Sequence, residues 1–271
     1  LYANGCKLPE ETHTLPQVFS ANGFATAHFG KLHLEPTMNH GLSHCSYGFE
    51  TCELGEGDQF LTHDDYNLWL REKNPRAFFE YYHQMGEKGH MRAYTSNLPE
   101  ELTLSHWVTE RGTNWLRARK SDARPFFLSL GYFDPHHAWN PCEPYANRWA
   151  GRAIAMPGVD TDDLARKPAH WAGGHGLDLF DLSSIIRSYH AMVSHLDACV
   201  GRLMETLEAT GLAEDTIVVF SSDHGEFLGN HGKLFKGPFL CDDLLRVPLI
   251  VWDGARRVGG ISTTSLTSSL D

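Results

Sequence analysis

The sequence lacks several features that would assign it to other classes of protein. It has no run of about 18 apolar residues, so no segment is predicted to span a membrane. Its six cysteines include no Cys-x-x-Cys pair, which argues against a structural zinc site. It has no internal repeat and no low-complexity linker. Positive charge is scarce, with 23 lysines and arginines against 34 aspartates and glutamates, and the net charge of −11 argues against nucleic acid as the main partner.

The composition and the pattern of the chain indicate one α/β domain. With 271 residues, 41% hydrophobic and 21% charged, the chain can bury one large core but is too short for two. Short apolar segments alternate with helical ones, which is typical of a mostly parallel sheet covered on both faces. The predicted strands are 24–29, 125–133, 216–221 and 247–252, and the predicted helices are 14–21, 102–119 and 182–209, the last stopped by Gly211.

The stretch 35–97 has no clear periodicity and is rich in Gly, His and Asp. Because loops of this length are usually functional or inserted, we interpret it as an insertion on the substrate side of the domain. His40, His44, Asp58 and His63 are its candidates for selecting a substrate, and the sequence favours none of them.

Asp223 and His224 come directly after the predicted strand 216–221. In parallel α/β sheets, ligands bind outside the carboxyl ends of the strands. A carboxylate and an imidazole on adjacent residues can both reach a divalent cation if the chain turns sharply, and Gly225 permits such a turn. An Asp that caps the next helix, with a His beside it, is an equally open interpretation of these two residues alone.

Three further segments place cationic or titratable side chains near strand ends. Lys31 and His33 follow the first predicted strand two residues apart, so an extended backbone would project both to one side. His136 lies in a proline turn after the second strand, and Lys236 follows the segment of Asp223 with Lys233 as its rival. Such groups can bind the oxygens of an anionic ester or transfer a proton to its leaving group. Taken alone, each of these segments is also compatible with surface charge or packing.

In their order along the chain, these motifs resemble those of the sulfatases, including arylsulfatases and choline sulfatases, in the alkaline-phosphatase-like superfamily. The matching segments cover most of the chain. They are Thr14-Leu15-Pro16, Gly23-Phe24-Ala25-Thr26-Ala27, Gly30-Lys31-Leu32-His33-Leu34, Pro125-Phe126-Phe127, Asp134-Pro135-His136, Ser194-His195-Leu196-Asp197, Val200-Gly201-Arg202-Leu203, Ser222-Asp223-His224-Gly225-Glu226, Lys236-Gly237 and Arg246-Val247-Pro248-Leu249-Ile250.

The resemblance implies a three-layer, doubly wound α/β fold and hydrolysis of sulfate esters at a divalent cation. Asp223 and His224 then correspond to metal ligands, and Ca²⁺ is the expected ion. Mg²⁺, which like Ca²⁺ prefers oxygen ligands, is an alternative, and the His nitrogen makes Mn²⁺ and Zn²⁺ alternatives as well. The residues expected to contact the sulfate or transfer protons are Lys31, His33, His136 and Lys236. A periplasmic or secreted location is expected over a cytoplasmic one.

The chain departs from the family pattern in three ways. It has no Cys- or Ser-x-Pro-x-Arg motif, whose Cys or Ser becomes the formylglycine nucleophile, and the surroundings of Cys6 lack the Pro and Arg. The paired metal-binding aspartates of the family are also absent, as is a smaller C-terminal subdomain beyond Asp271. We therefore expect a partial sulfatase domain, with its nucleophile upstream, that is inactive by itself. The alternatives are a phosphonate or phosphate mono- or diester hydrolase of the same superfamily and a non-catalytic member that binds anions or a partner.

Overall fold

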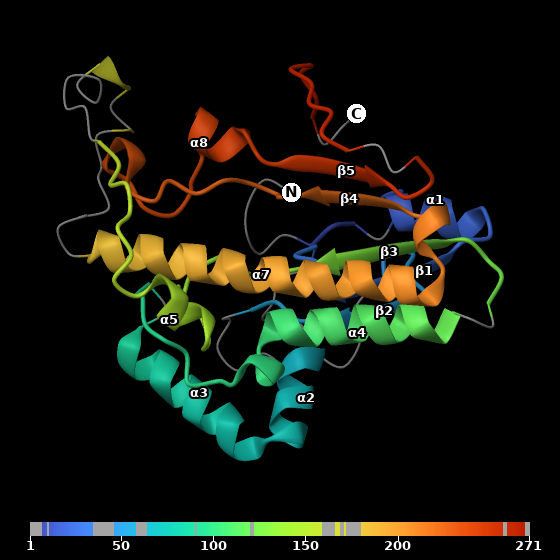
Figure 1. The fold of residues 1–271 in the computed structure, drawn as a ribbon, viewed down its shortest axis with the longest axis horizontal. Helices are drawn as coiled ribbons and strands as arrows, with labels where there is room; N and C mark the ends of the chain where they lie inside the picture. The colour runs from blue at the N-terminus through green and yellow to red at the C-terminus, as the bar shows by residue number, and fades with distance from the viewer. Residues whose placement is uncertain are drawn as a thin grey trace.

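The strands form two sheets that lie beside each other in the computed structural model (Figure 1). The structure describes residues 7–9, 11–34, 46–57, 64–89, 91–119, 122–158, 166–168, 171, 180–256 and 259–268. Within these residues, one sheet is parallel with the order β2-β1-β3, and the other is an antiparallel pair of β4 and β5. The strands are β1 Ala25–Gly30, β2 Thr51–Leu54, β3 Phe126–Gly131, β4 Ile217–Ser221 and β5 Leu249–Asp253.

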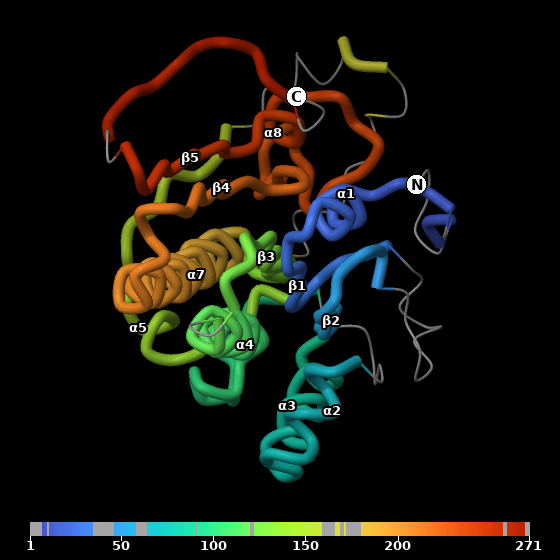
Figure 2. Tube along the Cα trace, turned by 90° about the vertical axis from the view of Figure 1, so that its right-hand side faces the viewer, coloured from blue at the N-terminus to red at the C-terminus, as the bar shows by residue number. Residues whose placement is uncertain are grey.

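Helices cover the parallel sheet on both faces, which confirms the predicted layering. In Figure 2, α1 lies on one side of β1 and β3 while α4 lies on the other, and α7 runs alongside α4. The helices are α1 Leu15–Ala21, α2 Asp65–Lys73, α3 Pro75–Lys88, α4 Leu104–Ala118, α5 Tyr145–Trp149, α7 Leu182–Thr210 and α8 Asp242–Leu245. No helix in these described parts is long and apolar enough to cross a membrane.

The long helix α7 begins and ends where the sequence predicts. Asp181 caps its start by accepting a hydrogen bond from the backbone of Ser184 at 3.1 Å. Gly211 ends it in a left-handed conformation, with φ of 74°, which a residue with a side chain adopts only at a cost. The helix then leads directly into β4, so the predicted order of helix and strand is confirmed.

One expectation about the fold needs correction. The stretch 35–97 is not simply an insertion, because β2 pairs in parallel with β1 and is followed by α2 and α3. The short strand TCEL lacks the apolar run that marks the four predicted strands. Residues 35–45 and 58–63 of this stretch lie outside the described parts. The antiparallel pairing of β5 with β4 is compatible with the predicted mostly parallel arrangement.

Trp107, on α4, lies at the centre of the largest core cluster and is fully buried. Its ring meets Tyr66 edge-on at 5.7 Å between centroids. We expect Trp107→Ala to lower the free energy of unfolding by about 3–5 kcal/mol, because it removes buried surface and leaves a cavity. Urea denaturation measures the change, and Phe79→Ala on the exposed side of α3 should shift it by less than about 0.5 kcal/mol. An equal decrease in the free energy of unfolding for both variants would contradict the assignment of Trp107 to the core.

Candidate metal and anion site

The carboxyl ends of β1 and β4 meet although the two strands belong to different sheets. Lys31, the residue after β1, donates a hydrogen bond from Nζ to Oδ2 of Asp223 at 3.2 Å. Asp223 itself lies two residues beyond the end of β4. The end of β1 is in turn fixed against β3, because the backbone of Lys31 donates to the carbonyl of Gly131 at 2.8 Å. A side chain at Gly131 would come within 2.0 Å of the Lys31 carbonyl oxygen, so only glycine permits this approach.

Asp223 and His224 form a two-residue donor set that fits a divalent cation. His224 Nε2 lies 3.6 Å from Asp223 Oδ2. Its other ring nitrogen, Nδ1, lies 2.8 Å from the carbonyl oxygen of Gly225. A carbonyl oxygen only accepts hydrogen bonds, so Nδ1 carries the proton and Nε2 keeps its lone pair for a metal. Partial burial alone would raise the pKa of the Asp223 carboxyl, but the ammonium group of Lys31, which also donates a hydrogen bond to it, holds the pKa below its usual value.

The turn that carries these two residues is fixed by contact with α8. Gly225 donates its backbone N–H to the carbonyl of Leu244 at 2.9 Å. A Cβ on Gly225 would lie 1.8 Å from the carbonyl oxygen of Asp243. The glycine is therefore required by the close approach of two backbones, and its φ is not among the positive ones. The alternative in which Asp223 caps the next helix is wrong for α8, whose N-cap is Cys241.

His33 does not extend from the strand as predicted. Its φ of 54° lies in the left-handed region, so it does not project beside Lys31 as two residues of an extended chain would. Oε1 of Glu56 accepts hydrogen bonds from the backbones of Leu32 and His33, both at 3.0 Å. Glu56 Oε2 lies 3.6 Å from His33 Nδ1, so the buried carboxylate fixes both the backbone and the ring.

Glu56 is a site residue that no pattern in the sequence reveals. It lies between two glycines in the stretch 35–97, without a strand or a motif to mark it. Burial by itself would raise its pKa, but the hydrogen bonds and charge of His33 and the N–H of Leu32 outweigh burial and lower it. The carboxylate is therefore charged at neutral pH and is matched by the His33 ring beside it.

His136 is a half-buried, neutral imidazole within the electrostatic field of two lysines. Burial lowers the pKa of the His136 imidazole most, and repulsion from the positive charges of His137, Lys236 and Lys31 lowers it further, to about 3. Its Nδ1 lies 2.6 Å from the carbonyl oxygen of His137, so Nδ1 carries the proton and Nε2 has the lone pair. In the free protein, His136 is thus a hydrogen-bond acceptor toward the site.

Lys233 and Lys236 differ in their surroundings. Lys233 is 1% exposed, and its Nζ donates to the carbonyl of Trp171 at 2.7 Å, which assigns it to packing. Lys236 acts electrostatically on both His136 and Glu226, two residues on the side of the candidate site. Burial raises the pKa of Glu226 to about 7, although Lys236 opposes the shift.

The described residues thus bring together Lys31, Asp223 and His224 by contact, and His136 and Lys236 by charge. No cluster of three or more His, Cys, Asp or Glu side chains able to hold a metal occurs in the parts of the chain that the structure describes. Asp223 and His224 would therefore supply only part of a cation's coordination. Several residues singled out in the sequence lie outside the described parts: Cys6, His40, His44, Asp58, His63 and Asp271.

Comparison with known proteins gives consistent matches along the chain. A family model described as Sulfatase matches residues 2–268. The multifunctional alkaline phosphatase superfamily protein PehA of Trinickia caryophylli is 30% identical over 196 residues, covering 65% of this chain and 38% of its own. The arylsulfatase of Clostridium perfringens is 27% identical over 278 residues, covering 92% of this chain and 53% of its own. The chain thus spans about half the length of the curated relatives it matches, or less.

Among solved structures, the phosphonate monoester hydrolase of Agrobacterium radiobacter matches with a TM-score of 0.69 and 23% identity. The match covers 93% of this chain and 54% of that one. At this identity the likeness shows the fold, and the predicted alkaline-phosphatase-like α/β fold is confirmed.

Proposed function

The chain belongs to the sulfatase family, and we propose that the whole protein is a metal-dependent hydrolase of sulfate esters. The observation that carries the proposal is the convergence of Lys31 Nζ and His224 Nε2 on Oδ2 of Asp223, at 3.2 and 3.6 Å. A carboxylate and an imidazole with a free lone pair are donors for a divalent cation, and an ammonium beside them attracts an anionic ester. These three groups come from the ends of β1 and β4, where an α/β sheet presents its ligands.

Asp223 and His224 would hold the cation through Oδ2 and Nε2. Ca²⁺ is the proposed ion, and the nitrogen ligand keeps Mn²⁺ and Zn²⁺ as alternatives. When bound, the cation supplies positive charge that stabilises the developing negative charge on the ester oxygens. Lys31 and Lys236 add two fixed cations for the non-bridging oxygens of the substrate.

His136 and His33 are proposed to handle protons and to orient the ester. Because Nε2 of His136 has a lone pair, it accepts a hydrogen bond from a hydroxyl group or a water in the site. An anionic substrate placed beside it raises its pKa, so the same atom can later donate a proton. His33 is held by Glu56, which fixes where its ring can meet the substrate. Because no Cys/Ser-x-Pro-x-Arg motif occurs in these 271 residues, the proposal requires the nucleophile elsewhere in the whole protein.

Hydrolysis of 4-nitrophenyl sulfate and of 4-nitrophenyl phosphate by the whole protein tests the proposal. We expect kcat/KM to favour the sulfate, and removal of the divalent cation by a chelator to abolish turnover because the cation stabilises the transition state. Restoring activity with Ca²⁺, Mg²⁺, Mn²⁺ or Zn²⁺ identifies the ion. The 271-residue chain alone should show only background rates.

Two outcomes would replace the proposal. A preference for the phosphate ester by orders of magnitude would favour the phosphonate or phosphate hydrolase, a reading that the similarity to the multifunctional PehA keeps open. No turnover of either ester, with retained binding of inorganic sulfate, would favour a non-catalytic anion-binding protein. The periplasmic or secreted location stays a prediction, as does a substrate-selecting role for the stretch 35–97.

A further inference from the structure

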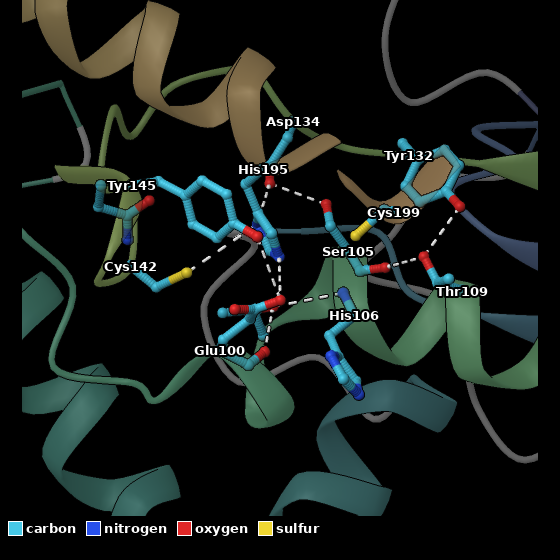
Figure 3. A network of polar contacts seen from close by, with 12 residues as sticks. Glu100, Ser105, His106, Thr109, Tyr132, Asp134, Cys142, Tyr145, His195 and Cys199 are labelled. Carbon is cyan, nitrogen blue, oxygen red and sulfur yellow. Dashed lines mark hydrogen bonds and ion pairs between the residues drawn. The ribbon is translucent and has the colours of Figure 1, made fainter. Parts of the chain in front are cut away.

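A buried histidine, His195, lies in the middle of α7 among carboxylates and thiols (Figure 3). It is 2% exposed. Its Nδ1 lies 3.8 Å from Asp134 Oδ2 and 4.0 Å from the sulfur of Cys142, and its Nε2 lies 4.0 Å from Oε1 of Glu100. The ring of Tyr145 covers it at 4.8 Å between centroids. None of these contacts belongs to the metal and anion site described above.

The surroundings of His195 favour its charged form. Burial by itself would lower the pKa of the imidazole, but Asp134 and the thiols of Cys142 and Cys199 outweigh it and raise the pKa to about 12. His195 is therefore an imidazolium at neutral pH, between the carboxylates of Asp134 and Glu100. Among the described residues, the other titratable or charged groups that face this network include Cys142, Tyr145, Cys199, Arg202, His106, Tyr66, Tyr81 and Tyr132.

Asp134 connects this buried network to the ester site. It follows β3 and accepts a hydrogen bond from the hydroxyl of Ser105, on α4, at 2.8 Å. Two residues later comes His136, whose backbone N–H donates to the carbonyl of Phe133 at 3.0 Å and closes the turn. On the outer side of the turn, Lys31 Nζ lies 5.8 Å from the centre of the Phe133 ring. The turn 133–136 thus contacts α4 and α7 through Asp134, and it contacts the candidate site through Phe133.

A cavity of about 50 Å³ borders the buried side of this turn. Asp134, Ala138, Cys142 and His195 are among the residues that line it. The space gives the Asp134 side chain and its turn room to shift if the ion pair is broken.

Resting on the proposed function, we propose that His195 is a positioning residue. As an imidazolium paired with Asp134, it fixes the turn 133–136 and thereby the place of His136 at the ester site. Without this charge, the Asp134 carboxylate would keep the Ser105 hydroxyl as its hydrogen-bond partner among the described side chains and would turn toward water. A displacement of His136 by about 1 Å is enough to lower catalysis about a hundredfold.

A double-mutant cycle between His195→Gln and His136→Ala tests the inference in the whole protein with its cation bound. We expect His195→Gln to lower kcat for 4-nitrophenyl sulfate about a hundredfold, with KM changed little. In the His136→Ala background, His195→Gln should lower kcat by less than about threefold, because the imidazole that His195 positions is already absent. Leu203→Ala is the matched control, since Leu203 is buried on the same helix in a different cluster, with Leu116, Leu207 and Ala213. Its effect should be small and equal in both backgrounds.

The outcomes separate the inference from the proposed function. If His136→Ala lowers activity and the double variant loses activity by the product of the two single factors, only the positioning role of His195 is overturned. If His136→Ala changes nothing, the role given to His136 fails and the inference falls with it.

A spectroscopic measurement does not depend on activity or on the folding of the His195 variant. The ring ¹⁵N signals of His195 should show both nitrogens protonated at pH 8, and Asp134→Asn should let the ring lose its proton near neutral pH. A neutral ring in the unsubstituted protein at pH 8 would overturn the inference, whatever the activity.

Discussion

Asp223→Asn should lower kcat/KM for aryl sulfates by on the order of a thousandfold in the whole protein. The substitution keeps the shape of the side chain but removes the charge that would hold the cation. Loss of several kcal/mol of transition-state stabilisation corresponds to such a factor. Because the Asp223 side chain is 64% exposed, the free energy of unfolding should change by no more than about 0.5 kcal/mol. Isothermal titration with Ca²⁺ should show the affinity lost together with the activity.

Asp242→Asn is the matched control for this variant. Asp242 begins α8, close to the candidate site in sequence, and its side chain is 83% exposed in an ion pair with Arg246. Exposed ion pairs of this kind contribute little to stability, and Asp242 is not one of the proposed ligands. Activity and Ca²⁺ affinity should therefore stay unchanged. If Asp223→Asn kept both properties, Asp223 would not be a metal ligand. If both variants lost activity alike, a general effect of acidic charge would explain the result better.

The strand ends that carry Lys31, His136 and Asp223 could be predicted because each follows a run of apolar residues. Such runs are buried strands, and a parallel sheet gathers their carboxyl ends on one edge. The meeting of Lys31 with Asp223 at 3.2 Å agrees with that reasoning, although the two strands belong to different sheets. Periodicity says which segments are strands but does not say which ones pair.

The parts that the sequence did not predict depend on contacts between distant segments. Glu56 is buried behind His33 by the pairing of β2 with β1, and β2 has no apolar run to reveal it. The left-handed backbone of His33 follows from that carboxylate and cannot be read from its neighbours. His195 is one of 17 histidines, and nothing within α7 indicates that Asp134 and Glu100 surround it.

Gly225→Ala should disable the candidate metal site without touching either ligand. The added methyl group would lie 1.8 Å from the carbonyl oxygen of Asp243, so the turn and α8 must move apart. That movement breaks the hydrogen bond from Gly225 to Leu244 and displaces Asp223 and His224 together. We expect about a hundredfold loss of kcat/KM, a weaker Ca²⁺ affinity, and a free energy of unfolding lower by about 1–3 kcal/mol.

Gly86→Ala distinguishes this steric effect from the general effect of replacing a glycine. Gly86 lies inside α3, where a Cβ would meet nothing within 4 Å. Alanine favours the helix, so the variant should be more stable by about 0.5–1 kcal/mol and equally active. Activity and urea denaturation of both variants, with Ca²⁺ titration of Gly225→Ala, give the comparison. If Gly225→Ala kept full activity and Ca²⁺ affinity, the contact between the turn and α8 would not determine the positions of Asp223 and His224.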